Sequence, residues 1–394
     1  MKAVILAALL FGVQAPLIAE GHALRSPLSQ ACVGATLPAL APQPARNPLS
    51  GLFASGVEPS AASAARYGTF CRAMEAYMRA WLIVLVAVLS TSLSSCAGQR
   101  SSRTPDHPVT TDTAAVDRSF PPSLGELSFE SGGSKLNGLM YVANGPVPHP
   151  TVIMLHGYPG NERNLDLAQA VRRAGMNVLY FDYRGTWGSG GEFSIPNALE
   201  DVAKAVELAR GKEWASAYRA DPDRVALVGH SLGGFLGAMT TAEDKRIACF
   251  AFLAGADLGW MGVQARTDAS ALAGLKSIFG QGMDAMGGPV HGDAERVVGE
   301  MVSRAEAWSV PARAANLATR PLLVMGAARD EVTPKTTHHD RLITALRQAG
   351  ALRLTEVVFD DDHVFSAHRI GLATRLVDWL RVEFWPGATT SRRK

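Results

Sequence analysis

The sequence predicts an α/β protein whose mostly parallel sheet carries helices on both faces. Between residues 121 and 385, an antiparallel hairpin is followed by segments that alternate between strand-like and helix-like patterns. The strand-like segments are nearly continuous apolar runs, as expected for strands that are buried on both faces. With 394 residues, 47% of them hydrophobic, the chain is large enough to bury such a core.

The predicted elements follow one another in a regular order. Residues 126–131 and 135–143 flank a Gly-Gly-Ser segment and predict the hairpin. Beyond it, short apolar runs predict strands, and longer segments with apolar residues at helical spacing predict helices. The strands are expected at 151–157, 177–185, 224–230, 247–257, 321–330 and 352–360, and the helices at 164–175, 197–210, 231–239, 336–350 and 367–384.

Residues 258–318 interrupt this alternation between two strands. They contain two segments, 271–286 and 294–308, that suit short amphipathic helices. An insertion of this length at the carboxyl edge of the sheet is expected to form a lid, and the alternative is a purely structural helical excursion. Its apolar side chains favour an acyl or aromatic substrate group, although they also serve to pack the lid: Leu258, Trp260, Met261, Leu272 and Phe279.

Ser231 lies where a predicted strand turns into a predicted helix. Gly229, Ser231 and Gly233 form the pattern G-x-S-x-G, the nucleophile elbow. Such a turn forces the serine backbone into strained dihedral angles, and the flanking glycines remove the Cβ atoms that would clash there. The serine hydroxyl is therefore expected at the carboxyl edge of the sheet, above the first turn of a helix.

A serine hydroxyl needs a base in contact with it, and that base needs an orienting carboxylate. In an open parallel sheet these groups come from the loops that follow the strands. Asp330, at the end of one predicted strand, and His363, in the loop after the next predicted strand, are the expected acid and base. Glu331 is the rival for the acid, and His368, at the start of the last helix, is interpreted as a cap or surface residue.

Other polar residues near these positions are interpreted as structural. His156 at a strand end is expected to form a structural hydrogen bond, and His230 is expected to pack beside the serine. His338 and His339 look solvent-facing, and residues 360–362, all aspartates, are interpreted as turn residues with solvated charge.

The negatively charged oxygen of the reaction intermediate needs two fixed N–H donors. The amide of Leu232, at the predicted helix start, is one candidate. The second is expected in the loop that follows residues 151–157, and we assign it to the amide of Tyr158.

The sequence gives no sign of a metal, a cofactor or a nucleic-acid partner. The glycine-rich segment 182–194 lacks the spacing of a phosphate-binding loop, so Asp182 and Arg184 are expected to fix loop geometry. The net charge is +2, and the only basic cluster is at 392–394. The four cysteines form no C-x-x-C pair, and Cys249 is expected to be a small buried core residue.

The first part of the chain predicts export. Residues 78–95 carry a positive start, an apolar stretch and a sequence that resembles the bacterial lipobox, with Cys96 as the lipidated residue. The apolar stretch is shorter than a membrane span, which disfavours the alternative of an anchor helix. Residues 1–77 are expected to be a mis-assigned or disordered extension, and 96–120 a flexible tether. We therefore expect a lipid-anchored protein of the bacterial cell envelope.

Taken together, the motifs HGYPGN, DYRGTWGSGG, GHSLGG, GAARDEVTP and DDDHVF resemble those of the α/β-hydrolase superfamily. The set is similar to the branch with dienelactone-hydrolase-like and prolyl-oligopeptidase-like catalytic domains. The resemblance covers residues 121–385 and implies an eight-stranded sheet, a Ser231-Asp330-His363 triad and hydrolysis through an acyl-enzyme, without a metal. No β-propeller pattern precedes it, which weakens a peptidase assignment.

A serine at the elbow, where dehalogenases and epoxide hydrolases of this superfamily carry a carboxylate, argues against those two chemistries. We expect a carboxylesterase acting on a small acyl substrate. The alternatives are an aminopeptidase-like serine peptidase, an acyltransferase, and a non-catalytic binding protein of the same fold. The sequence leaves the oligomeric state open.

Overall fold

The computed structural model describes residues 77–79, 107–113 and 115–386. The chain divides into a unit 1–99, of which only the helical residues 77–79 are described, and a unit 100–394. The predicted lipidation site Cys96 and most of the predicted signal segment lie outside the described residues. Among the helices that the structure describes, none combines the length and the apolar character needed to cross a bilayer.

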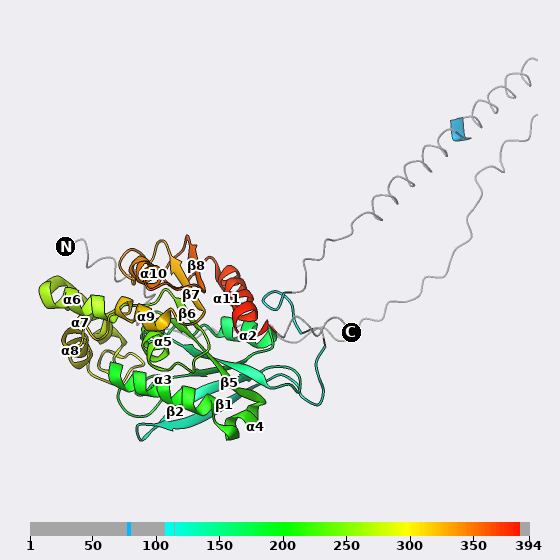
Figure 1. The fold of residues 1–394 in the computed structure, drawn as a ribbon, viewed down its shortest axis with the longest axis horizontal. Coiled ribbons are helices and arrows are strands. Elements are labelled where there is room, and N and C mark those ends of the chain that lie inside the picture. The colour runs from blue at the N-terminus through cyan, green and yellow to red at the C-terminus, as the bar shows by residue number, and fades with distance from the viewer. Residues whose placement is uncertain (1–76, 80–106, 114, 387–394) are drawn as a thin grey trace, which may run out of the picture. The chain divides into compact units, whose positions relative to one another are not determined.

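The second unit is built on one eight-stranded sheet with the order β1-β2-β4-β3-β5-β6-β7-β8 (Figure 1). Strand β2 pairs antiparallel with both β1 and β4, and the pairs from β4 onward are parallel. This confirms the predicted mostly parallel sheet and its opening hairpin. The strands are β1 Ser123–Ser131, β2 Ser134–Val142, β3 His149–Leu155, β4 Asn177–Phe181, β5 Ala220–His230, β6 Phe250–Leu253, β7 Leu322–Ala327 and β8 Leu354–Phe359.

The helices between the strands follow the predicted alternation, with three additions, α4, α6 and α9, which were not predicted. None of the residues of α4 is fully buried, and only Trp214 and Tyr218 pack partly against the core, so its apolar signal is short. The helices are α2 Leu165–Arg173, α3 Ile195–Ala209, α4 Lys212–Tyr218, α5 Leu232–Glu243, α6 Leu258–Thr267, α7 Ala269–Gly282, α8 Ala294–Ser303, α9 Ala314–Leu317, α10 His339–Gln348 and α11 Arg369–Glu383, with the 3-10 turns η1 Asp284–Met286 and η2 Pro311–Arg313.

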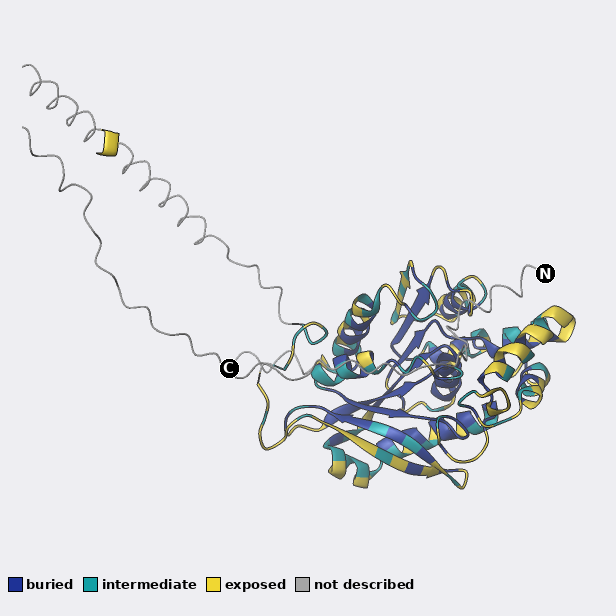
Figure 2. Cartoon of the chain, turned by 180° about the vertical axis from the view of Figure 1, so that it is seen from behind, coloured by how far each residue is buried: buried dark blue, intermediate teal, exposed yellow. Residues whose placement is uncertain are grey.

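Two apolar cores lie on the two faces of the sheet. One contains buried side chains of α3, α5 and α10, and the other contains those of α2 and α11. Strands β3, β4, β6 and β7 and residues 225–230 of β5 are therefore buried on both sides, and they appear dark blue at the centre of Figure 2. Cys249 is a buried core residue beside β6, as predicted.

Helices α6 to α9 lie between β6 and β7, in the segment expected to form the lid. Each of the three longer ones begins at an aspartate whose carboxylate accepts a hydrogen bond from the first helical turn: Asp257 for α6, Asp268 for α7 and Asp293 for α8. Figure 1 shows α6, α7 and α8 gathered at one end of the unit, and their outer faces are exposed (Figure 2).

Candidate active site

Ser231 follows β5 directly and begins α5, so the predicted elbow is present. Its backbone has φ 55° and ψ −120°, a conformation that side-chain-bearing residues rarely adopt. The neighbouring glycines make this turn possible. A Cβ at Gly229 would lie 2.1 Å from the carbonyl oxygen of Gly233, and one at Gly233 would lie 2.2 Å from that of Leu155. Only glycine fits at these two positions.

Hydrogen bonds to the neighbouring strand hold the strained serine in place. Its N–H donates to the carbonyl of Leu253 at 3.1 Å, and its own carbonyl accepts from the N–H of Ala256 at 3.0 Å. Among the described residues, the Ser231 hydroxyl has no hydrogen-bond partner, although the residue is only 8% exposed. The backbone is therefore fixed, and the hydroxyl is left available for chemistry.

The structure brings Asp330 and His363 together at the same edge of the sheet. His363 Nδ1 lies 2.8 Å from Asp330 Oδ2, and the Asp330 side chain is almost fully buried. Burial alone would raise the pKa of Asp330, but the hydrogen bonds from His363 and Thr333 outweigh it, so this pKa lies below its ordinary value. Asp330 is therefore a carboxylate at neutral pH.

Thr333 completes the surroundings of this carboxylate, and the sequence reasoning missed it. Its N–H donates to Asp330 Oδ1 at 2.8 Å and its hydroxyl to Oδ2, also at 2.8 Å. The N–H of Val332 donates to Oδ1 as well, at 2.9 Å. The spacing of an aspartate and a threonine three residues later is the one available sequence signal, and it is typical of a turn rather than of a catalytic site.

The Asp330 contact also fixes the tautomer of His363. A carboxylate only accepts hydrogen bonds, so Nδ1 carries the hydrogen and Nε2 carries the lone pair. Among the described residues, Nε2 of His363 has no hydrogen-bond partner. An imidazole held in this way presents its basic nitrogen to whatever enters the site.

His230 packs against His363, next to Ser231, which agrees with the prediction that His230 has a packing role. Its Nε2–H donates to the His363 carbonyl at 2.9 Å, and the two ring centroids are 4.8 Å apart. Burial lowers the pKa of His230 to about 3, so it remains neutral. Since His230 directly precedes Ser231, this contact places the His363 loop next to the elbow.

The loop after β3 lies against the serine. A Cβ at Gly157 would be 2.9 Å from the Ser231 Cβ, so the Gly157 backbone lies close to the Ser231 side chain. His156 Nδ1–H donates to the Gly157 carbonyl at 2.7 Å. In a trans peptide the C=O and N–H point in opposite directions, so the Tyr158 N–H points away from His156. His156 thus has the predicted structural role and orients this amide.

The two backbone amides assigned to the oxyanion make no other hydrogen bond within the described residues. Among the described residues, the N–H groups of Tyr158 and Leu232 donate to no other group of the chain. Leu232 is the first residue of α5, where the N–H groups lack partners inside the helix and carry its positive dipole end. Both amides are free to bind an oxyanion.

The Tyr158 side chain ties this loop to the helical insertion. Its hydroxyl donates to the Phe279 carbonyl in the last turn of α7, and its ring lies 4.6 Å from the Phe279 ring. A Cβ at Gly282 would collide with the Tyr158 ring. The helical insertion therefore packs directly against the loop that carries the Tyr158 amide.

The rivals for the acid and the base lie elsewhere. Glu331 is exposed, whereas Asp330 beside it is buried against His363. His368 stands at the N-cap position of α11, and its Nδ1 pairs with Asp361 at 2.8 Å. The interpretation of Asp361 as a solvated charge was wrong, because it is 2% exposed and also accepts N–H bonds from its own loop.

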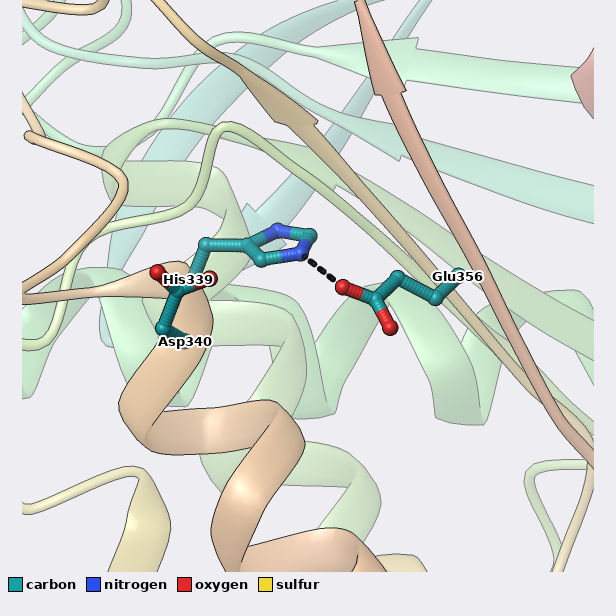
Figure 3. Close-up of side chains that lie close together, drawn as sticks. All are labelled: His339, Asp340 and Glu356. Carbon is teal, nitrogen blue, oxygen red and sulfur yellow. Dashed lines mark hydrogen bonds and ion pairs between the residues drawn. The ribbon is translucent and has the colours of Figure 1, made fainter.

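The expectation of solvent-facing histidines at the start of α10 was also wrong. His338 and His339 are 2% and 3% exposed. His339 Nε2 lies 3.1 Å from Glu356 of β8, and Asp340 is close to both (Figure 3). Within the described residues, these three side chains form a group that could hold a metal ion. Its carboxylates already have cationic partners, with Asp340 2.6 Å from Lys335 and Glu356 2.6 Å from Arg347. This group joins α10 to β8.

Asp182 and Arg184 fix loop geometry, as predicted. The guanidinium of Arg184 pairs with the fully buried Asp201 of α3 at 2.6 Å, and its backbone N–H donates to the same carboxylate at 2.8 Å. Asp182 accepts a hydrogen bond from the Tyr180 hydroxyl at 2.8 Å. Both residues stabilise the glycine-rich loop after β4.

The sequence profile described as "Alpha/beta hydrolase family" matches residues 152–373, more than half of the chain. The chain belongs to the alpha/beta hydrolase family. The match contains the elbow serine and both members of the Asp330-His363 pair, and the family's fold agrees with the sheet described above.

Curated relatives match shorter stretches of this chain than the family profile does. The quorum-quenching protein AidA of Acinetobacter baumannii is 33% identical over 129 residues, which cover 31% of this chain and 41% of AidA. An uncharacterized 31.7 kDa protein of Escherichia coli is 36% identical over 114 residues, 27% of this chain and 38% of that protein. The chain thus matches about two fifths of the length of these relatives.

Two solved structures are similar to this chain at low identity. An esterase of Pyrococcus furiosus is 18% identical with a TM-score of 0.49, covering 68% of this chain and 92% of that one. Est1E of Butyrivibrio proteoclasticus is 21% identical with a TM-score of 0.48, covering 66% of this chain and 98% of that one.

Proposed function

We propose that this chain is a serine hydrolase that cleaves a carboxylic ester through Ser231, His363 and Asp330. The observation that carries the proposal is the buried Asp330-His363 hydrogen bond at the edge where the strained Ser231 stands. With Nδ1 engaged by this carboxylate, Nε2 is the ring nitrogen that can accept a proton. A buried carboxylate that orients a histidine next to an elbow serine is the arrangement that activates a hydroxyl nucleophile.

The reaction follows from these groups. His363 Nε2 takes the proton of the Ser231 hydroxyl as Oγ attacks the carbonyl carbon, and Asp330 stabilises the imidazolium that forms. The Leu232 and Tyr158 amides bind the carbonyl oxygen as it becomes negative. The imidazolium then gives its proton to the departing alcohol oxygen, which leaves an acyl group on Ser231. Water repeats the sequence and releases the acid.

A carboxylic ester is the substrate class that this site fits best. The site offers one base and one oxyanion pair, and the apolar Phe279 ring packs on Tyr158 beside it. We expect a small or aromatic acyl group to bind near these rings.

Turnover of p-nitrophenyl acetate and butyrate by the full chain tests the proposal. The wild type should release p-nitrophenol, and Ser231→Ala should reduce kcat by about 10⁴-fold or more, because the acyl-enzyme cannot form. Ser303→Ala, at an exposed serine of α8, is the matched control and should retain wild-type turnover. A folded wild type without turnover would instead support a non-catalytic binding protein.

A further inference from the structure

His338 is a second buried histidine close to the proposed site, and the reaction above does not use it. It lies in the loop after β7, only 2% exposed. Its Nδ1 lies 2.9 Å from the backbone nitrogen of Asp257. A backbone N–H can only donate, so Nδ1 of His338 is the acceptor, and its Nε2 carries the hydrogen.

This Nε2–H is a donor without an acceptor. Among the described residues, no oxygen or nitrogen accepts a hydrogen bond from it. The nearest aromatic neighbour is Trp260 of α6, whose ring centroid lies 5.1 Å from that of His338, with the planes at 78°. Nε2 of His156 and Nδ1 of His230 are fully enclosed without a partner, whereas Nε2 of His338 keeps some accessible surface. Water or a ligand can therefore supply its acceptor.

Two connections place His338 at the reaction site. Asp257, which holds its Nδ1, directly follows Ala256, and the N–H of Ala256 donates to the carbonyl of Ser231. The negative charge of Asp330 acts on the His338 imidazole. One short stretch of backbone after β6 therefore anchors both the nucleophile and this second histidine.

We propose that the Nε2–H of His338 binds a neutral oxygen acceptor of the substrate, such as an ether, hydroxyl or ketone oxygen, at a position beyond the scissile carbonyl. This inference rests on the proposed ester hydrolysis and adds a substrate feature to it. His338 would then discriminate between an ester with such an oxygen and the same ester with a methylene in its place. A site with a buried donor rejects the analogue that lacks the acceptor, because the donor is then left unpaired.

The neutrality of the acceptor follows from the charge of His338. Burial lowers its pKa to about 4, so the imidazole is uncharged at neutral pH. A neutral donor has no net charge to attract a carboxylate, and the carboxylate of Asp330 nearby repels one.

Two substitutions distinguish the hydrogen bond at Nδ1 of His338 from the one proposed at Nε2. In His338→Asn, the short amide keeps an acceptor near the Nδ1 position and loses the distal donor. In His338→Gln, the longer amide can place an N–H near the Nε2 position. His368→Asn is the matched control, because His368 pairs with Asp361 away from the proposed site.

The test is a ratio of kcat/KM values for isosteric esters. One arm compares p-nitrophenyl methoxyacetate with p-nitrophenyl butyrate, and the other compares 2-methoxyethyl butyrate with butyl butyrate. A changed ratio in the first arm places the acceptor on the acyl side of the ester, and a changed ratio in the second arm places it on the alcohol side. Dividing each variant's ratio by the wild-type ratio removes the intrinsic reactivity difference of the esters. His338→Asn should lower the ratio about 10-fold in one arm, while His338→Gln should stay within about 3-fold of the wild type.

Three results would overturn the inference. The first is an unchanged ratio in both arms for a folded His338→Asn protein, and the second is an equal loss in His338→Gln, which would show that the distal N–H does not discriminate between the esters. If His338→Asn does not fold, the wild type decides: a preference no greater than that of hydroxide-catalysed hydrolysis contradicts the proposal. A wild type inert to all four esters would be a failure of the proposed function itself, and is distinguishable from these results.

Discussion

The loops that follow β7 and β8 each carry a histidine, buried in the first case and partly buried in the second, and the two histidines are held in opposite tautomers. His363, after β8, donates from Nδ1 to the carboxylate of Asp330. His338, after β7, accepts at Nδ1 from the backbone N–H of Asp257. The distal nitrogen is consequently a base in the first case and a donor in the second.

This difference shows that the partner of Nδ1, rather than the histidine itself, decides what the ring can do. A carboxylate leaves a lone pair at Nε2 and stabilises the charged ring that forms during proton transfer. A backbone amide leaves a hydrogen at Nε2 and gives no such stabilisation, and burial then keeps the ring neutral. The same residue type is therefore suited to proton transfer at one loop, as proposed for His363, and to hydrogen-bond donation at the other, as proposed for His338.

The largest expected effect comes from removing the carboxylate that fixes the His363 tautomer. Asp330→Asn keeps an oxygen to accept the N–H groups of Val332 and Thr333, but it offers His363 an amide that can stabilise the wrong tautomer. We expect kcat for p-nitrophenyl butyrate to fall about 10⁴-fold, with the melting temperature changed little. Steady-state kinetics and a thermal melt measure the two quantities.

Glu331→Gln is the matched control for this experiment, because Glu331 is the exposed carboxylate next to Asp330. We expect its kcat to remain within about 2-fold of the wild type, as is usual for a surface change. Equal losses in both variants would mean that Asp330 is not the orienting acid.

A smaller effect is expected in the pH dependence of the free energy of unfolding, and it reports on the charge state of His338. The pKa of His338 is about 4 in the folded chain and about 6.5 when unfolded. Between these values the unfolded chain binds a proton that the folded chain does not, so the contribution to stability is complete above pH 6.5 and is lost as the pH falls toward 4. His338→Asn should reduce the slope of unfolding free energy against pH by up to about 1.4 kcal/mol per unit.

Urea denaturation of both proteins from pH 4.5 to 7 measures these slopes. His156 and His230 stay in both proteins and contribute in the same direction, because burial lowers their pKa values to about 4 and about 3. Parallel curves for the wild type and His338→Asn would show that His338 is already charged in the folded state.

The sequence predicted the frame of this site because its signals are local. The elbow could be located from the apolar run before Ser231, the helical spacing of apolar residues after it and the two flanking glycines. Asp330 and His363 could be assigned to one edge because each follows a predicted strand. Parallel strands bring their carboxyl ends to a common edge whatever their separation along the chain. These are consequences of topology, which an alternating pattern specifies.

The surroundings of the frame could not be predicted, because they depend on which way a loop turns. His338, His339 and Asp361 are polar residues in polar segments, and nothing in their local pattern distinguishes a solvated residue from a buried one. Their burial comes from α6 packing on the loop after β7, from β8 beside α10, and from the turn before α11. Partners such as Asp257 for His338 are distant in sequence and become visible only in the fold.

The most direct test of the central claim is to locate the adduct of a fluorophosphonate on the folded protein. Such a reagent is attacked only by an activated serine hydroxyl. We predict one covalent adduct after incubation at neutral pH, on the peptide that contains Ser231, and no adduct after unfolding or in Ser231→Ala. Peptide mass spectrometry identifies the site. A folded protein that remains unlabelled, or one labelled at a different residue, would contradict the assignment of Ser231 as the nucleophile.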